Sequence, residues 1–444
     1  MHYTALQVTS AHHLERFLGQ IASLPGFVCI GTPPSRTKAL RGQWLAAKPI
    51  QFLCLAGESR ASLARKVLLA MAPLHECTRL AGILDYDAGY SLEPAIRQWH
   101  SPGSRQPIRI GVYAWWLEPD LTANGLRLCR TPDCPAGIEQ EILSLLQASK
   151  AANGQGLPQF SVKTFRADLS REQYVDAVYK VQHYIQNGDI YQANLSQRFE
   201  STYTGSLWQA FSQLCKKFPS PHCGYLKLGT ETVLSISPES FLEINKGSVR
   251  TQPIKGTRPR GRTAHEDQLQ AEKLKASAKD RAENIMIVDL LRNDLGRVSE
   301  TGSVVVESLA ELHSFVNVHH LVSTVSSRLK AGIHPFEALL WCFPGGSITG
   351  APKIRAMEII AELEVSPRGP YCGSLFWLNG EGKLYSNIAI RTLYARDEKL
   401  YCHGGGGVVA DSSPAGEYQE TLDKVGPLMQ ELSGNAQILA PADP

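Results

Sequence analysis

One lysine is placed by its neighbours as a reactive amine. Lys255 lies in the segment Thr-Gln-Pro-Ile-Lys-Gly-Thr, between Pro253 and Gly256, so the backbone on both sides constrains where its side chain points. A lysine amine held in this way can act as a nucleophile when it is neutral. An ordinary surface lysine is the commoner interpretation of a single residue, and the residues downstream make the catalytic one stronger.

Two pairs of carboxylates have the spacing of a metal site. Asp280 and Glu283 lie in one predicted helix, and Glu417 and Glu420 lie in another that begins at Ser413-Pro414. The i, i+3 spacing puts both acids of a pair on one helix face. If the two faces meet, four oxygen ligands without a nearby His or Cys favour Mg²⁺. Either pair alone is also typical of a solvated helix face.

Two glycine-rich segments are suited to binding an anion. The segment 344–353, Pro-Gly-Gly-Ser-Ile-Thr-Gly-Ala-Pro-Lys, leads into a predicted helix whose backbone N–H groups can receive a carboxylate. It is not a Walker A loop, because Ile354 stands where that motif has Ser or Thr. The run 403–408, His-Gly-Gly-Gly-Gly-Val, allows close backbone approach to a ligand, although plain turns also use glycine runs.

Composition narrows the class of protein. The 444 residues are 43% hydrophobic and 20% charged, with 45 basic against 42 acidic residues and no dense basic block. We therefore expect neither a nucleic acid nor a membrane as partner. The 10 cysteines contain no CxxC pair and are read as reduced thiols. No signal peptide or membrane-spanning run is recognisable, so the cytoplasm is the expected location.

The apolar pattern predicts strands interrupted by helices. Apolar runs at 26–30, 51–56, 108–117, 232–236 and 241–244 predict strands, and a turn at 245–247 precedes another at 248–251. Helical spacing of Tyr174, Val178, Val181 and Ile185 predicts a helix ending at Gly188. Without regular βαβ alternation, this order indicates an α+β fold with large antiparallel sheets.

Periodicity is lost over 147–158, where small polar residues accumulate. We place the main boundary there, between an amino-terminal region 1–150 and a second domain 159–435. A linker is the simplest interpretation of the intervening segment.

Several motifs together resemble the chorismate-utilising enzymes over about Phe160 to Gln430. They are Gly188-Asp-Ile-Tyr-Gln-Ala-Asn-Leu-Ser196, Ile236-Ser-Pro-Glu239, Pro253-Ile-Lys-Gly-Thr257, Asp289-Leu-Leu-Arg-Asn-Asp-Leu-Gly296, Gly350-Ala-Pro-Lys353 and Ala410-Asp-Ser-Ser-Pro414. The segment Gly82-Ile-Leu-Asp-Tyr-Asp-Ala-Gly89 is similar, more loosely, to the amino-terminal region of anthranilate synthase component I. The resemblance implies the family's fold, a sandwich of large antiparallel sheets with helices on the outside.

Within that family, two positions imply the chemistry. Lys255 resembles the aminodeoxychorismate synthases, whose lysine attacks ring carbon C2 of chorismate while the C4 hydroxyl leaves, whereas anthranilate synthases typically carry Ala there. Gln192 stands where the water-using isochorismate and salicylate synthases have Lys, which implies ammonia as the incoming nucleophile. Glu239 matches the general acid, which burial should keep protonated. We also expect a lowered pKa at Lys255.

The resemblance also assigns the cofactor. It implies Mg²⁺ ligated by Glu283 and Glu420, with Glu417 and Asp280 supporting the ion through water. Asp280 departs from the Glu found in many members, which leaves its role open. The ion would act as a template and Lewis acid for the ring carboxylate.

The remaining matched positions bind chorismate in the family. Their roles are to hold carboxylates through an arginine, a tyrosine, a lysine and backbone donors, and to line the ring pocket: Arg391, Tyr371, Lys424, Gly405, Gly407, His320 and Ser347. A core histidine and a capping serine are the alternatives for the last two.

No glutaminase signature is present, since no glycine-flanked Cys nucleophile with downstream His and Glu is found. The resemblance therefore implies a heterodimer with a class I glutamine amidotransferase that supplies ammonia. The implied product is 4-amino-4-deoxychorismate, a precursor of 4-aminobenzoate and folate. Two alternatives stay open: anthranilate synthase component I, and a non-catalytic sensor of an aromatic amino acid.

Overall fold

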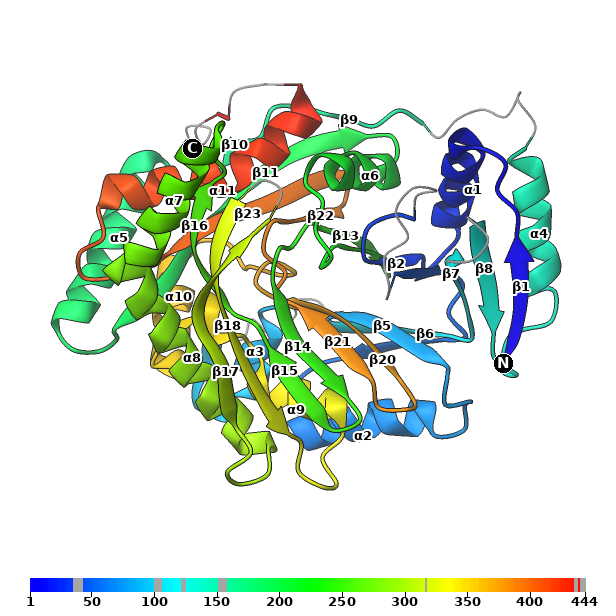
Figure 1. The fold of residues 1–444 in the computed structure, drawn as a ribbon, viewed down its shortest axis with the longest axis horizontal. Coiled ribbons are helices and arrows are strands. Elements are labelled where there is room, and N and C mark those ends of the chain that lie inside the picture. The colour runs from blue at the N-terminus through cyan, green and yellow to red at the C-terminus, as the bar shows by residue number, and fades with distance from the viewer. Residues whose placement is uncertain are drawn as a thin grey trace.

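Two large antiparallel sheets form the centre of the molecule (Figure 1). The computed structural model describes residues 1–34, 43–99, 106–120, 125–150, 158–315, 318–434 and 438–439. The sheets have 13 and 10 strands, and every pairing between named strands is antiparallel. The predicted α+β sandwich is confirmed.

The first sheet runs from the amino-terminal strand to the strands that carry the glycine run. In order it contains β1 (His2–Leu6), β8 (Gly125–Arg130), β7 (Trp115–Asp120), β3 (Trp44–Ala46), β2 (Val28–Ile30), β12 (Gly224–Leu228), β13 (Glu231–Ser235), β22 (Thr392–Arg396), β23 (Lys399–Val408), β11 (Gln192–Thr204) and β10 (Arg166–Ala167). Two short strands, β19 (Gly350–Ala351) and β9 (Ser161–Val162), also pair with β11.

The second sheet carries the predicted nucleophile at one end. Its order is β16 (Ile254–Pro259), β18 (Val318–Arg328), β15 (Ser248–Thr251), β14 (Ser240–Asn245), β21 (Leu384–Asn387), β20 (Ser374–Asn379), β5 (Arg79–Leu84), β6 (Ile108–Tyr113) and β4 (Gln51–Leu55). The long strand β17 (Val305–Ser314) pairs with the other side of β18.

Helices pack around the sheets and along one end of the sandwich (Figure 1). They are α1 (Ala11–Ser23), α2 (Arg60–Met71), α3 (Ala88–Leu92), α4 (Ile138–Ala148), α5 (Arg171–Gln186), α6 (Leu207–Lys217), α7 (Ala264–Ala276), α8 (Ala278–Val298), α9 (Pro335–Cys342), α10 (Lys353–Leu363) and α11 (Pro414–Ser433), with short 3₁₀ turns η1 (Pro94–Trp99) and η2 (Gly346–Ile348). No helix in the described ranges has the length and apolar character needed to span a membrane.

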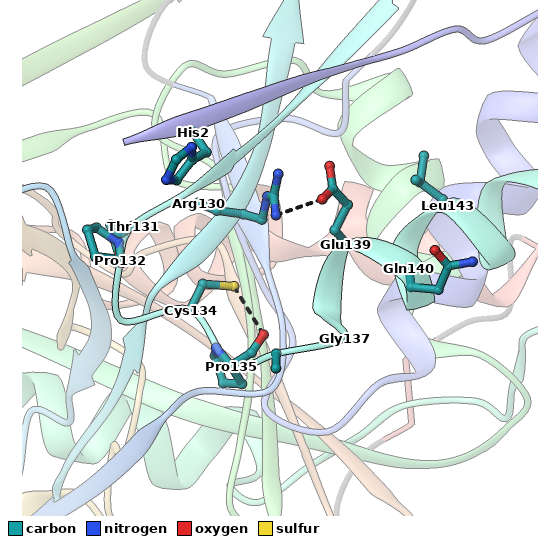
Figure 2. Close-up of a pocket in the computed structure, with 11 residues that line it drawn as sticks. His2, Arg130, Thr131, Pro132, Cys134, Pro135, Gly137, Glu139, Gln140 and Leu143 are labelled. Carbon is teal, nitrogen blue, oxygen red and sulfur yellow. Dashed lines mark hydrogen bonds and ion pairs between the residues drawn. The ribbon is translucent and has the colours of Figure 1, made fainter.

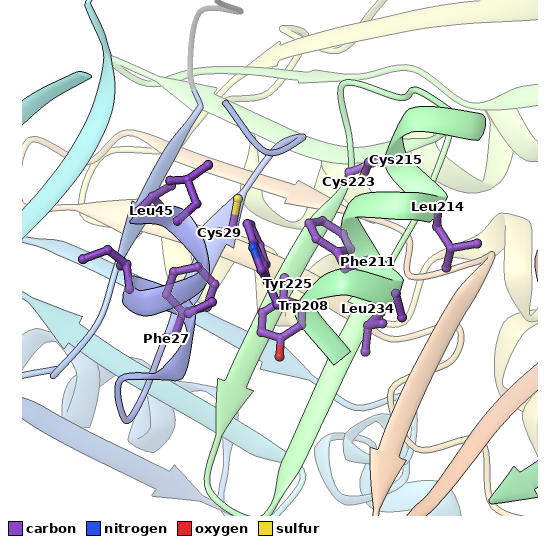
Figure 3. Close-up of a cluster of buried hydrophobic side chains, with 14 of the residues drawn as sticks. Phe27, Cys29, Leu45, Trp208, Phe211, Leu214, Cys215, Cys223, Tyr225 and Leu234 are labelled. Atoms are coloured by element: carbon purple, nitrogen blue, oxygen red, sulfur yellow. The ribbon is translucent and has the colours of Figure 1, made fainter. Parts of the chain in front are cut away.

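The strands are apolar on both faces because each face is buried against other helices or strands. In β2, Cys29 packs in the cluster beneath α1 and α6, whereas Val28 and Ile30 pack in a second cluster that includes Leu375 of the other sheet. Figure 3 shows Trp208 and Phe211 of α6 beside Tyr225 of β12 in the first cluster. Side chains alternate along a strand, so burial on both sides produces the continuous apolar runs of the sequence.

One predicted strand is wrong in an informative way. The run 108–117 forms two strands, because β6 ends at Tyr113 and β7 begins at Trp115. These strands belong to different sheets, so the chain crosses the sandwich at Ala114. Tyr113, Ala114 and Trp115 are fully buried, and the continuous apolar run 110–117 gave no sign of the crossing.

Other local predictions are confirmed. The turn between β14 and β15 has Lys246 at φ 50° and Gly247 at φ 77°, as a tight hairpin requires. Helix α5 begins with a capping box at Ser170 and ends before Gly188, which has φ 80°.

Both sheets combine strands from either side of residue 150. Of the predicted boundary at 147–158, residues 151–157 lie outside the described residues, and the division into two domains stays a prediction.

Candidate active site

A β-bulge places Lys255 beside the short turn η2. The register of β16 against β18 shifts between Lys255 and Thr257, and Gly256 between them has φ 70°. A Cβ atom at 256 would lie 2.8 Å from Leu274 and 3.0 Å from Asp280, so glycine is required by conformation and by space. The Lys255 Nζ donates to the Ser347 carbonyl oxygen at 3.3 Å.

Glu239 also contacts Ser347. It follows β13 in the turn Ser-Pro-Glu, where its N–H donates to Ser237 Oγ at 3.1 Å. The Ser347 hydroxyl donates to Glu239 Oε1 at 3.3 Å. The nucleophile and the acid predicted from sequence therefore meet at Ser347, although one comes from β16 and the other from the turn between β13 and β14.

The charges of Glu239 and Lys255 oppose the pKa shifts that burial causes in these two residues. Burial raises the pKa of Glu239 to about 7, and the positive charge of Lys255 opposes that rise. Burial also lowers the pKa of Lys255, which the charges of Glu239 and Glu283 oppose. Both directions match the sequence-based expectation of a protonated acid and a more neutral amine.

Helix α11 brings its two glutamates against the glycine strand. Glu417 Oε1 accepts from Ser412 Oγ at 2.6 Å, whereas Glu417 Oε2 is buried and has no hydrogen-bond partner among the described residues. A Cβ at Gly406 would lie 2.8 Å from that oxygen and 3.1 Å from Glu420 Oε1. Lys424 Nζ lies 2.6 Å from Glu420 Oε1 and donates to the Gly405 carbonyl at 2.9 Å.

The pKa of Glu283 on α8 is also shifted by burial and by neighbouring charges. Burial raises the pKa of Glu283, and the charges of Asp280 and Glu420 raise it further. Asp280 is held by Arg258, whose Nη2 lies 3.1 Å from Asp280 Oδ2. The charge of Glu420 on α11 thus acts on Glu283 of α8, while Asp280 is paired with Arg258, a residue that the sequence did not single out.

The four carboxylates do not form a closed ligand shell. Within the described ranges, three ligand atoms within 4.8 Å of one another occur only at Glu76, Cys77 and Glu381, in another part of the fold. The glutamates of α8 and α11 nevertheless suit a hard cation, because all their donors are oxygen. The unpartnered Glu417 Oε2 is the kind of buried acceptor that a cation or its water satisfies.

Arg391 is held as a cation without a counter-ion. The backbone of Arg391 has φ 48°, a conformation that residues other than glycine seldom adopt. Arg391 lies in the turn that leads into β22. Burial lowers the pKa of its guanidinium. None of the described carboxylates forms an ion pair with it. A half-buried, unpaired arginine is suited to receive a substrate carboxylate.

His320 lies on the Arg391 side of the site. Its Nδ1 is 2.9 Å from Thr257 Oγ1, and Phe315 packs edge-on at 5.6 Å. Burial lowers the pKa of His320, and the charge of Arg391 lowers it further. Both effects favour the neutral imidazole, and the bulge that positions Lys255 also places Thr257, the hydrogen-bond partner of His320.

The glycine strand offers backbone donors at an open edge. Strand β22 pairs with β23 only as far as Cys402, so Gly405 and Gly407 have a neighbouring strand only at β11. The Gly405 carbonyl accepts from Lys424, so it faces away from β11. In an extended strand the N–H of that residue, and of Gly407 two residues on, points to the same side.

Two further predicted residues border this strand. Gln192 is buried, and its Nε2 would lie 2.1 Å from a Cβ at Gly407, so the amide crosses directly over that glycine. Tyr371 is also buried, and its ring lies parallel to that of His403, with centroids 5.0 Å apart.

Only part of the predicted anion-binding turn at 344–353 contributes to the site. Ser347 joins the site, as described above. Lys353 does not, because its Nζ pairs with the buried Asp294 at 2.6 Å and donates to the Cys342 carbonyl at 3.2 Å. The lysine at the end of the turn is therefore structural.

Comparison with known proteins identifies the family. A family model described as chorismate binding enzyme matches residues 32–430. The chain belongs to the chorismate binding enzymes.

Relatives of the chain carry two different activities in their names. The chain is 45% identical over 351 residues to aminodeoxychorismate synthase component 1 of Klebsiella aerogenes, covering 79% of this chain and 76% of the relative. It is 43% identical over 373 residues to anthranilate synthase component 1 of Thermus thermophilus, covering 81% and 80%. Overall identity alone therefore does not separate these two activities within the chorismate binding enzymes.

A solved structure shares the whole architecture. Anthranilate synthase component I from Streptococcus pneumoniae superposes with a TM-score of 0.72 at 26% identity, covering 96% of this chain and 92% of that chain. The fold of this chorismate binding enzyme thus extends through its amino-terminal half.

Sequence reasoning missed one buried ion pair that supports the site. Arg368 pairs with Glu364 at 2.7 Å and donates to the carbonyls of Ile348 and Asn194 at 2.9 and 2.6 Å. Glu364 also accepts from the N–H and hydroxyl of Ser196, each at 2.8 Å. The pair ties η2 to β11. Its only signal in the sequence is an arginine inside the Pro-rich segment 366–370.

A separate surface pocket of about 430 Å³ lies at the other end of the molecule, between β1, β8 and the start of α4 (Figures 1 and 2). Its one cation in view, Arg130, is already paired with Glu139 at 2.8 Å. No residue predicted for catalysis or substrate binding lines it.

Proposed function

We propose that this chain is component I of an aminodeoxychorismate synthase, which converts chorismate and ammonia to 4-amino-4-deoxychorismate and water. The observation that carries the proposal is the placement of Lys255, with its Nζ 3.3 Å from the Ser347 carbonyl and Glu239 bonded to the same serine. The names of the relatives from Klebsiella aerogenes and Escherichia coli agree with it.

In this mechanism the neutral Lys255 amine forms a bond to ring carbon C2, the two ring double bonds shift along the ring, and the C4–O bond breaks. Glu239 gives its proton to the departing oxygen, which leaves as water. Ammonia then bonds to C4, the two double bonds return to their original positions, the C2–N bond to Lys255 breaks, and Glu239 takes a proton back from the new C4 ammonium group. Two easier displacements replace one difficult step.

The pKa shifts suit these roles. A carboxyl group with a pKa of about 7 is a useful acid near neutral pH, since about half of it carries the proton. A lowered pKa at Lys255 increases the fraction of neutral amine.

The binding residues fix the two carboxylates of the substrate. Arg391 and Tyr371 hold one of them, with the N–H groups of Gly405 and Gly407 as further donors. Lys424 neutralises the other, while His320 and Gln192 border the ring and the incoming nucleophile.

The glutamates at 283, 417 and 420 would hold Mg²⁺, with Asp280 in a supporting position at most, because Arg258 occupies its carboxylate. The ion would neutralise and orient a substrate carboxylate when bound.

Ammonia would come from a separate glutamine amidotransferase subunit, component II, in a heterodimer that works in the cytoplasm. No glutaminase signature is present in this sequence. Free ammonium should then replace the partner when it is supplied at high concentration.

The test is incubation with chorismate, ammonium and Mg²⁺, followed by mass spectrometry of the products. The wild type should form 4-amino-4-deoxychorismate, and Lys255→Ala should lose at least about 10³-fold in rate, because a covalent route has been removed. Lys273→Ala on the exposed face of α7 is the matched control and should keep wild-type activity.

A second measurement looks for the intermediate. Without ammonia, the wild type should gain the mass of chorismate less one water on the peptide that contains Lys255. Formation of anthranilate and pyruvate would refute the assignment within the family, and unchanged turnover by Lys255→Ala would refute the covalent step.

A further inference from the structure

A run of stacked aromatic rings ends at the proposed carboxylate site. Tyr401 stacks on Tyr394 with centroids 5.0 Å apart, Tyr394 on His403 at 6.1 Å, and His403 on Tyr371 at 5.0 Å. The last contact is the most parallel, with an interplanar angle of 10°. The series thus connects strands β22 and β23 to the segment that carries Tyr371.

His403 contributes a buried ring with a nitrogen that is unpartnered in the described part of the chain. It is 1% exposed, and its Nε2 has no hydrogen-bond partner among the described residues. Burial holds its pKa well below the ordinary value, and the charges of Arg198 and Arg368 lower it further. A buried polar atom without a partner costs stability, so packing must favour this flat, neutral ring here.

Tyr371 depends on side-chain contacts for its position. Its backbone lies in a tight turn, with the Tyr371 N–H donating to the Arg368 carbonyl at 3.1 Å and Cys372 following at φ 59°. No regular strand or helix includes Tyr371. The guanidinium of Arg368 lies 5.8 Å from the Tyr371 ring centroid, which makes His403 the closer of the two ring contacts.

His403 also immediately precedes the glycine run within β23. The residues Gly405 and Gly407, proposed as carboxylate donors, follow it on the same strand β23. Movement of His403 would therefore change the spacing between Tyr371 and these backbone donors.

We propose that His403 is a positioning residue, whose ring holds Tyr371 at the correct distance from the backbone donors of β23. The inference rests on the proposed function, in which Tyr371 and those donors share one substrate carboxylate. It predicts an effect on substrate binding and little effect on the chemical step, because Lys255 and Glu239 meet at Ser347 and not at this ring.

The test is steady-state kinetics with chorismate varied at saturating ammonium and Mg²⁺. His403→Leu should raise KM for chorismate about two- to tenfold, the range expected for loss of an aromatic pair, with kcat changed less than twofold. His403→Met supplies a second non-aromatic variant if the leucine variant folds poorly. His403→Phe keeps a flat ring and should keep KM within about twofold of the wild type.

Two comparisons separate positioning from general loss of packing. Tyr401→Leu removes a buried ring at the far end of the same series and should leave KM unchanged, even if the thermal midpoint falls. In a Tyr371→Phe background, which lacks the hydroxyl, His403→Leu should no longer raise KM.

Unchanged KM in both non-aromatic variants would overturn the proposal. So would an equal rise in KM for His403→Phe, or the same rise in the Tyr371→Phe background. If the wild type does not consume chorismate, the proposed function fails, and the carboxylate role of Tyr371 fails with it.

Discussion

Replacing Glu239 by Gln should have opposite effects on turnover and on the reactivity of Lys255. The substitution keeps the size and the hydrogen-bonding shape of the side chain, but the amide cannot deliver a proton to the C4 oxygen. General acid catalysis typically contributes about 10²- to 10⁴-fold, so kcat should fall by a factor in that range.

The structure gives the size of what is lost. With a pKa of about 7, Glu239 is about half protonated at pH 7, whereas a carboxyl at its ordinary value of 4.5 would be protonated to only about 0.3%. Burial therefore increases the acid form roughly 150-fold. The half that is ionised acts on Lys255, whose pKa its charge raises.

The amine should respond in the other direction. Glu239→Gln removes that negative charge, so the pKa of Lys255 should fall further and more of the amine should be neutral at pH 7. Each unit of that fall is a tenfold gain in neutral amine. The assay is the rate at which an amine-acylating reagent labels Lys255, followed by mass spectrometry of its peptide.

Glu243→Gln on β14 is the matched control, since it makes the same change outside the Lys255 contacts and should alter neither rate. A fall in both turnover and labelling of Glu239→Gln would indicate a collapsed site. An unchanged labelling rate would refute the electrostatic coupling that we infer between the acid and the amine.

Further predictions concern stability and binding. In the folded protein the pKa of Glu239 is raised from 4.5 to about 7, so the wild type should lose about 3 kcal/mol of its free energy of unfolding as pH rises between these values. Glu239→Gln should not show this loss, which denaturant unfolding at pH 4 and pH 8 would measure. Glu417→Gln should reduce the rise in thermal midpoint that Mg²⁺ produces; an undiminished rise would exclude Glu417 from the ion. Arg391→Met should raise KM for chorismate more than it lowers kcat, since it removes a carboxylate contact made throughout the reaction. Arg368→Met leaves the buried Glu364 carboxylate without its cation, so the free energy of unfolding should fall by about 3–5 kcal/mol, and a loss below 1 kcal/mol would contradict the network described here.

Local sequence was sufficient for features set by neighbouring residues. The turn at Lys246 and Gly247 and the capped helix α5 follow from turn chemistry and from 3.6-residue spacing, and both are present. The glycine on which the Lys255 bulge depends was also visible as Gly256. These features depend on φ preferences and side-chain period, which a short segment carries by itself.

Other features were invisible because both sides of the sandwich are buried. The strand predicted over 108–117 contains the crossing from one sheet to the other at Ala114, and apolar residues on both sides of that point conceal it. The pairing of Asp280 with Arg258 was hidden for a related reason. The spacing of charged residues in a helix shows which of them share a face, but it does not show which basic residue of a neighbouring strand will pair with them.

The sequence by itself was enough to select the candidate reactive groups: the lysine between Pro253 and Gly256, the acid of the Ser-Pro-Glu turn, and the glycine run of β23. Only the tertiary structure decided their meeting, because Lys255, Glu239 and Ser347 come from separate parts of the chain and converge through strand register and the turn η2. It also set their pKa values, since burial is a property of the packed sandwich and has no counterpart in a local segment.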